Sequence, residues 1–182
     1  MLSVLEKLRE IILVLEAQVA GLLAELTLRL AGQARPKGFG ELSLVTLESE
    51  ICDWKRFYNR KQVGSYTGCC PGEHSSGSKR VPGSVTKHGN PRLRAALVEC
   101  AWRMVRFQPQ YPPVKKRLAI LAKGAHATGA QRKKAIVAVA RHLAVDLWRV
   151  HTGRCSAAQL GLKSAETLIV RGEQKAELNA LA

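Results

Sequence analysis

The sequence predicts a mainly α-helical protein, in which an N-terminal coiled-coil helix precedes a small helical domain with a long, basic, Gly- and Ser-rich loop. Apolar residues recur at helical spacing in several segments. Regular periodicity fades between residues 54 and 90, where glycine, serine and cationic residues gather. The chain has 182 residues, of which 46% are apolar, so it can bury one core. We divide it into residues 1–33, 34–53, 54–154 and 155–182.

The first thirty residues are expected to form one long helix. Their apolar residues alternate in steps of three and four, which is the heptad pattern of a coiled coil. This seam comprises Leu5, Leu8, Ile12, Leu15, Val19, Leu22 and Leu26. One interpretation is a dimerising coiled coil, either between chains or folded back within one chain. The other is a core helix of a bundle.

The segment 34–53 is expected to contain a turn followed by a helix. Pro36 ends the first helix, Gly38 and Gly40 flank Phe39, and helical periodicity continues to about Ile51. A helix, a Gly-x-Gly turn and a second helix form a helix-hairpin-helix-like pattern, whose free backbone N–H groups can hold a phosphate. The alternative is an ordinary turn without a ligand.

The rest of the chain is expected to consist of helices and one long loop. A short helix over 62–67 packs against Phe57, and residues 68–90 form a loop that is either functional or disordered without a ligand. Asn90 and Pro91 begin a helix that runs to about residue 107. Further helices are expected over 114–122 and 131–150, and residues 165–181 form a short helix or fray. The expected inward faces comprise Leu93, Leu97, Cys100, Met104, Ile136, Val139, Leu143, Leu147 and Val150.

The positive charge is concentrated in one block. The net charge is +15, and all of the excess falls between Trp54 and Arg154. A block of nearly one sign favours a polyanionic partner, nucleic acid above all, over a merely basic soluble surface. The first turn of the last helix carries Arg132, Lys133 and Lys134, which oppose the helix dipole unless a polyanion binds there. The alternative is a tolerated surface cluster.

Several other classes are disfavoured. No run of about 18 uncharged apolar residues suggests a membrane span, and we find no signal peptide at the N-terminus. The five cysteines have neither metal-ligand nor disulfide spacing, since Cys69 and Cys70 are adjacent. We therefore expect a cytoplasmic protein that binds neither a membrane nor, through this chain, a metal.

A series of short segments carries a family resemblance between about Gly38 and Gly153. They are Arg56-Phe57, Lys61-Gln62-Val63, Tyr66-Thr67-Gly68, Pro71, Ser76-Gly77, Gly83, Thr86-Lys87, Gly89-Asn90, Leu93-Arg94, Ala96-Leu97, Ala101-Trp102, Lys134-Ala135 and Ala138-Val139-Ala140-Arg141. In this order and spacing, the chain resembles the C-terminal transposase domain of the insertion-sequence one-hundred-ten family. These are DEDD-type, bridge-RNA-guided serine recombinases, which implies a role in DNA transposition and recombination.

The resemblance implies that Ser76 is the nucleophile, with Ser75 as the second choice. Its hydroxyl would attack a DNA phosphodiester and form a phosphoserine link, and a serine needs a base or a metal for this. Phosphoryl transfer also needs neutralisation of the phosphate oxygens, for which the candidates are Lys79, Arg80, Lys87, Arg92 and Arg94. The basic block contains three carboxylates, Glu73, Glu99 and Asp146. We do not expect them to form a two-metal site.

The family also implies partners for this chain. Its members carry an N-terminal RuvC-like domain whose DEDD tetrad holds Mg²⁺, joined by a coiled coil, and the active site is completed in a multimer. This chain starts within the coiled coil, so we expect a fragment, a decayed copy, an internal start or half of a split enzyme. The expected partners are DNA, a bridge RNA and further copies of the chain. The alternative function is a catalytically inactive, nucleic-acid-binding and oligomerising remnant.

Overall fold

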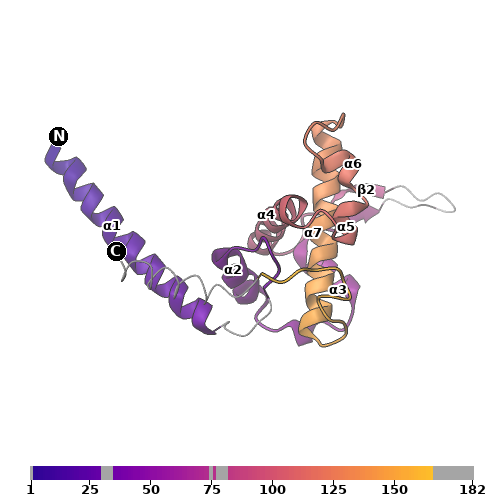
Figure 1. Ribbon diagram of the computed structural model, residues 1–182, viewed down its shortest axis with the longest axis horizontal. Helices are drawn as coiled ribbons and strands as arrows, with labels where there is room; N and C mark the ends of the chain where they lie inside the picture. The colour runs from indigo at the N-terminus through magenta and orange to yellow at the C-terminus, as the bar shows by residue number, and fades with distance from the viewer. Residues whose placement is uncertain (1, 30–34, 74–75, 77–81, 166–182) are drawn as a thin grey trace, which may run out of the picture.

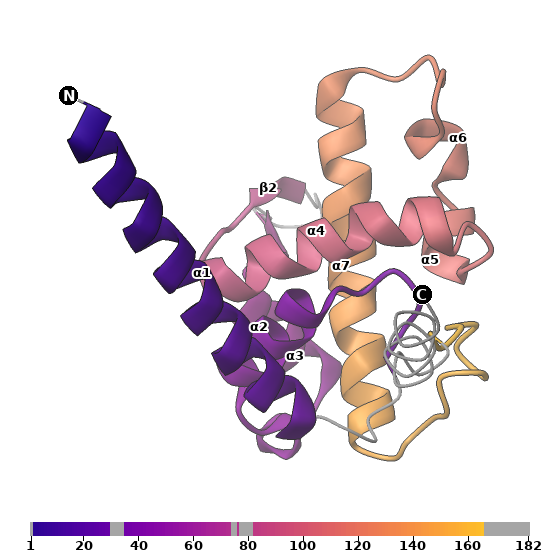
Figure 2. The ribbon, with the colours of Figure 1, turned by 60° about the vertical axis from the view of Figure 1, so that its left-hand side comes forward.

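The computed structural model describes residues 2–29, 35–73, 76 and 82–165, and these residues are mostly helical. Figure 1 shows α7 (Gly129–His151) at the centre, with α4 (Pro91–Phe107) crossing it and α2 (Glu41–Ile51) beside α4. The long helix α1 (Leu2–Arg29) extends away from this unit as an arm, which Figure 2 shows from a second direction. The mainly α-helical class predicted from the sequence is confirmed.

Helix α4 begins where the sequence predicts. The side-chain oxygen of Asn90 accepts hydrogen bonds from the backbone N–H groups of Arg92 and Leu93, each at 3.0 Å, and Pro91 occupies the first turn. Asn90 therefore satisfies donors that a helix start otherwise leaves free. The expected inward face is also confirmed, because the fully buried side chains include Leu93, Leu97, Cys100 and Met104.

Helix α7 supplies the other half of the core. Thr128 and Gln131 form a capping box at its N-terminus, since each side chain bonds the other's backbone N–H. Of the predicted inward residues, Val150 is half-buried and the others are buried, namely Ile136, Val139, Leu143 and Leu147. These side chains pack with α4 into one cluster that also contains Leu47 and Ile51 of α2.

A short helical connection links α2 to the rest of the core. It consists of η1 (Trp54–Arg56) and α3 (Arg60–Thr67), which starts two residues before the predicted short helix. The backbone carbonyl of Phe57 accepts a hydrogen bond from the Trp148 indole at 3.2 Å. The Phe57 ring lies 5.4 Å from the ring of Tyr66, measured between centroids. The prediction that this helix packs against Phe57 is therefore confirmed.

The segment predicted as one loop contains a hairpin. Strands β1 (Pro71–Glu73) and β2 (Pro82–Val85) pair antiparallel within residues 68–90. The prediction of an irregular loop throughout is wrong here, because backbone pairing forms without the apolar alternation that usually marks a strand. This two-stranded sheet lies at the edge of the helical unit in Figure 1.

The predicted helix over 114–122 is two short helices. They are α5 (Pro112–Lys115) and α6 (Leu118–Leu121), separated by Lys116 and Arg117. The backbone at Arg117 leaves the helical region, with φ −117° and ψ 8°. The periodicity of Val114, Leu118 and Leu121 survives this break, which is why a single helix was expected.

A buried polar pair holds α5 against α7. The Tyr111 hydroxyl donates a hydrogen bond to a carboxylate oxygen of Asp146 at 2.6 Å, and the Arg149 guanidinium contacts the other oxygen at 3.2 Å. Burial, together with the negative charge of Asp146, raises the pKa of Tyr111, so its hydroxyl remains a donor. Both carboxylate oxygens of Asp146 are thus engaged by residues of the fold, Tyr111 and Arg149.

Residues 155–165 pack against the turn before α2. The N–H of Lys37 donates to the carbonyl of Lys163 at 2.7 Å, and the buried Gln108 amide donates to both carbonyls, of Lys37 at 2.7 Å and of Lys163 at 3.1 Å. This long-range contact ties the two ends of the helical unit together. The short helix or frayed end expected over 165–181 lies, beyond Ala165, outside the described residues.

A stacked histidine makes the stability of this unit pH-dependent. The His151 ring stacks on Trp54 at 4.8 Å, and its Nε2 lies 3.4 Å from a carboxylate oxygen of Glu48. Burial lowers the pKa of His151 below its ordinary 6.5, although Glu48 opposes this. The unfolded chain then binds a proton at a higher pH than the folded chain does. We therefore expect the free energy of unfolding to fall as the pH drops below about 6.5.

Urea unfolding between about pH 7.5 and pH 5 measures this dependence. In His151→Gln, the free energy of unfolding should depend less steeply on pH than in the wild type. His142, whose pKa burial also lowers, contributes in the same direction, so the slope of the variant is compared with that of the wild type. An equal slope in the two proteins would contradict a role for His151.

Candidate nucleic-acid interface

Ser76 lies in the connection between the two strands of the hairpin. Pro71 is paired with Val85 and Glu73 with Pro82, and the exposed Ser76 follows Glu73 by three residues. Other predicted or neighbouring residues of this connection lie outside the described residues, namely His74, Ser75, Gly77, Lys79 and Arg80.

The base of the hairpin is held against the end of α3. The N–H of Thr86 donates to the carbonyl of Cys70 at 2.9 Å, and the N–H of Asn90 donates to the carbonyl of Tyr66 at 2.8 Å. Gly89 lies between these contacts with φ +152°, and a Cβ there would be 2.6 Å from both the Gly68 nitrogen and the Tyr66 oxygen. Only glycine fits this approach of two backbones.

Two predicted cations meet at this base, and a third joins them. The Arg94 guanidinium donates to the carbonyl of the exposed Lys87 at 3.1 Å, and Lys87 itself has φ +57°. Arg141 of α7 lies against Gly64 and Cys70, with its Nε 3.1 Å from where a Gly64 Cβ would stand. Sequence reasoning did not assign Arg141 to the site. The sequence offered one signal for Arg141, namely a charged residue among apolar residues in the segment 138–141 that carries the family resemblance.

The adjacent cysteines have different surroundings. Cys69 is 3% exposed and its N–H donates to the Thr67 hydroxyl at 3.2 Å, whereas Cys70 is half-buried beside Arg141. Burial raises the pKa of the Cys69 thiol, although the Thr67 hydrogen bond and the Arg94 charge oppose this. Cys69 therefore remains a neutral core side chain.

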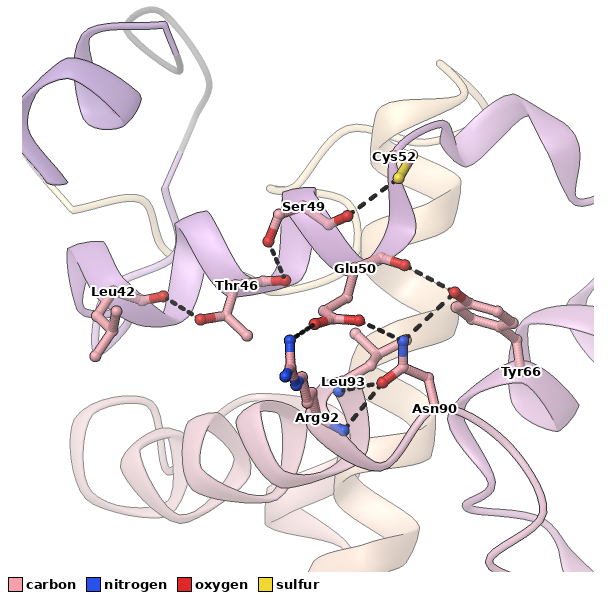
Figure 3. Close-up of polar contacts among 9 residues, drawn as sticks. All are labelled: Leu42, Thr46, Ser49, Glu50, Cys52, Tyr66, Asn90, Arg92 and Leu93. Atoms are coloured by element: carbon pink, nitrogen blue, oxygen red, sulfur yellow. Dashed lines mark hydrogen bonds and ion pairs between the residues drawn. The ribbon is translucent and has the colours of Figure 1, made fainter. Parts of the chain in front are cut away.

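A polar network surrounds the start of α4, as Figure 3 shows. The Asn90 amide donates to one carboxylate oxygen of Glu50 at 2.6 Å, and the Arg92 guanidinium lies 3.6 Å from the other. The Tyr66 hydroxyl donates to the Glu50 carbonyl at 2.8 Å. The helix start is thus already capped by Asn90 and faces an anion. The phosphate predicted there would have to compete with Glu50 for Arg92, whose side chain is 83% exposed.

The Gly38–Gly40 turn precedes α2, as predicted. Gly38 has φ +98° and packs against Phe107, while Gly40 is the N-cap and provides no side-chain hydrogen bond to the helix. The Arg103 guanidinium lies 2.7 Å from where a Gly40 Cβ would stand and pairs with Glu99 at 2.6 Å. Arg103 was not predicted. A groove of about 730 Å³ opens here, and its walls carry the cations Arg35, Arg92 and Arg103.

The three cations at the start of α7 have different roles. The half-buried Arg132 donates to the carbonyl of Ala125 at 2.8 Å and so supports the preceding loop. Lys133 and Lys134 are exposed. Lys134 and Arg141 lie on the same helix, about 10 Å apart along its axis. The cluster at the start of α7 is therefore about two helical turns from the base of the hairpin.

Part of the sequence is similar to a known protein family. Residues 34–114 match the family model described as Transposase IS116/IS110/IS902 family. The match covers less than half of the chain, and residues 34–114 are similar to a transposase domain of this family. The matched range begins just before the Gly38–Gly40 turn, includes Ser76 and Arg94, and ends in α5.

Similar proteins are transposases by name. The putative transposase y4rJ of Sinorhizobium fredii is 39% identical over 114 residues, which are 62% of this chain and 28% of that protein. The probable family 20 transposase of Pseudomonas aeruginosa is 28% identical over 110 residues, or 57% of this chain and 32% of its own length. The transposase for insertion sequence element IS1111A of Coxiella burnetii is 32% identical over 69 residues, which are 38% of this chain and 19% of that protein.

The chain spans about a third or less of the length of these curated relatives. No solved structure matches it.

Within the described ranges, no group of three His, Cys, Asp or Glu residues could hold a metal ion. Glu99 pairs with Arg103, and Asp146 is bound by Tyr111 and Arg149. Both carboxylates are therefore engaged by partners within the fold. In the same part of the chain, no helix is both long and apolar enough to cross a membrane.

Proposed function

We propose that this chain is the DNA-binding part of a transposase and supplies Ser76 as the nucleophile for strand exchange at the ends of an insertion sequence. The observation that carries the proposal is the position of Ser76. It is exposed between two paired strands whose base is fixed by backbone contacts to α3, and it falls within the matched transposase domain.

The proposed reaction is a phosphoryl transfer to serine. The Ser76 oxygen forms a bond to phosphorus while the bond to the leaving deoxyribose oxygen breaks, and the hydroxyl proton passes to a base. The Arg94 guanidinium is held at the base of the hairpin by the Lys87 carbonyl. Arg94 and the exposed Lys87 side chain would neutralise phosphate oxygens, as would Lys79 and Arg80 in the connection. We assign the activating groups for the hydroxyl to a separate DEDD domain, since Glu99 and Asp146 have other partners.

Other cations extend the proposed contact with DNA. Arg92, Lys133 and Lys134 are exposed. Gly40 leaves the start of α2 without a side-chain cap, which agrees with a phosphate held by the Gly38–Gly40 turn. A guide RNA would use the same kind of surface, because its backbone carries the same charge.

A covalent adduct tests this function. The chain is mixed with insertion-sequence end DNA, a guide RNA and Mg²⁺, with and without a separately produced DEDD domain of a related transposase. We expect an adduct that survives denaturant when the DEDD domain is present, with the DNA mapped to Ser76 by mass spectrometry. Salt-sensitive binding without an adduct in either mixture would instead identify the inactive, DNA-binding remnant.

We also propose that α1 joins this chain to a second copy. Six residues of the predicted heptad seam are 50–61% exposed, which leaves an apolar stripe along the arm seen in Figure 2. Charged residues stand beside the stripe, including Glu6, Arg9, Glu10 and Glu16. The same stripe on a second copy matches it in length and register, as a coiled coil requires. The exposed seam residues are Leu5, Leu8, Ile12, Leu15, Val19 and Leu22.

Charges in the seam should separate the copies. We expect the wild type to be an oligomer and the double variant Leu8→Glu, Leu15→Glu to raise its dissociation constant by more than about 100-fold, because burying each leucine is worth about 2 kcal/mol. Analytical ultracentrifugation measures this constant. Leu13→Glu is the control, since Leu13 is equally exposed but lies off the seam. A monomeric wild type at micromolar concentration would disprove the proposal.

A further inference from the structure

An exposed aromatic residue stands among cations in the connection from η1 to α3. The Tyr58 side chain is 80% exposed, the largest exposure among the described large apolar and aromatic residues. Asp53 is the one carboxylate of residues 53–70, and it accepts a hydrogen bond from the Lys55 N–H. We name this surface the Tyr58 platform, comprising Tyr58 and the exposed cations Lys55, Arg56, Arg60 and Lys61.

The backbone under Tyr58 is fixed on both sides. The preceding carbonyl, of Phe57, accepts the Trp148 indole N–H at 3.2 Å, and the Tyr58 N–H donates to the Gln62 side chain at 2.8 Å. The next residue, Asn59, caps α3 by accepting from two backbone N–H groups. The ring is therefore presented from an ordered backbone, so little conformational entropy is lost there when a ligand stacks on it.

One cation of the platform is also held in place. The Arg56 guanidinium carbon lies 4.3 Å from the centroid of the Tyr66 ring and 4.8 Å from that of Phe57. These contacts are within the range of cation–π attraction. Arg56 is thus held by the rings of Phe57 and Tyr66, whereas Lys55 and Lys61 are exposed side chains that can follow the path of a flexible chain.

We propose that the Tyr58 platform binds unpaired nucleotides, with a base stacked on the Tyr58 ring and the flanking phosphates on Lys55, Arg60 and Lys61. Stacking needs an open base face, which a paired strand does not offer because its neighbours cover both faces. Four exposed cations within three residues of one exposed aromatic residue fit the alternating bases and phosphates of a single strand. This inference rests on the proposed nucleic-acid function and adds a strand preference to it. Single-stranded DNA and RNA share the chemistry.

Anisotropy with labelled oligonucleotides tests the platform on the full chain. The probes are oligothymidylate and oligouridylate of about 16 nucleotides, and a duplex of the same length. We expect Tyr58→Ala to raise the dissociation constant for a single strand about tenfold and to change that for the duplex less than about twofold. Tyr58→Phe should bind like the wild type. The two single strands identify whether DNA or RNA is preferred.

Trp102→Ala is the matched control, since Trp102 is a 43% exposed aromatic residue of α4 and is not one of the platform residues. The loss from Tyr58→Ala should be the same at low and high salt, because stacking neutralises no phosphate. Equal losses for duplex and single strand, or unchanged single-strand binding in Tyr58→Ala, would overturn the platform while leaving the proposed function intact. A wild type that binds none of the three probes would instead refute the proposed function.

Discussion

Ser76→Ala is expected to abolish the covalent protein–DNA adduct and to leave the dissociation constant for DNA within about twofold. The substitution removes the atom that would bond to phosphorus, and losing a nucleophile reduces such reactions more than about 1000-fold. It changes no charge, and affinity for a phosphodiester backbone depends mainly on cations. Because Ser76 is exposed, the fold should tolerate the change. Adduct formation by denaturing gel and DNA binding by anisotropy measure the two quantities separately.

Two other serines complete this test. Ser84→Ala is the matched control, because Ser84 is exposed on β2 of the same hairpin, and its adduct yield should equal that of the wild type. Ser75→Ala tests the neighbouring hydroxyl. An adduct that persists in Ser76→Ala and disappears in Ser75→Ala would move the nucleophile by one residue. Loss in all three variants would point to a damaged hairpin.

The helices could be predicted because their signals are local. The start of α4 follows from Asn90 and Pro91, and its inward face follows from apolar residues three and four apart. The same periodicity gave α7 and α1. It failed at Arg117, where the backbone changes direction without a glycine or proline to mark the break.

The hairpin and the polar contacts of the site depend on distant residues. The strands are short and rich in glycine and proline, so no alternation marks them. Glu50 reaches the start of α4 across forty residues of sequence, and Arg141 reaches Gly64 and Cys70 from another helix. No spacing rule connects such pairs. The position of Ser76 was accessible through the family pattern, but its place between two strands was not.

Gly89→Ala is expected to destabilise the helical unit by about 3–5 kcal/mol, from steric overlap and backbone strain together. A Cβ at residue 89 would lie 2.6 Å from two backbone atoms and 2.8 Å from a third, the carbonyl oxygen of Ser65. Backbone atoms cannot move aside as a flexible side chain can, and φ +152° is unfavourable for alanine. Separating the two segments would also break the hydrogen bond from Asn90 to Tyr66.

Urea unfolding followed by circular dichroism measures this loss. Gly129→Ala is the control, because nothing lies within 4 Å of its Cβ position, and it should be neutral or stabilising by up to about 1 kcal/mol. Since Gly89 lies where the hairpin returns to α3, its substitution should also reduce adduct formation at Ser76. An unchanged unfolding midpoint in Gly89→Ala would mean that the two backbones do not meet there. The backbone contacts described between the base of the Ser76 hairpin and the end of α3 would then be contradicted as well.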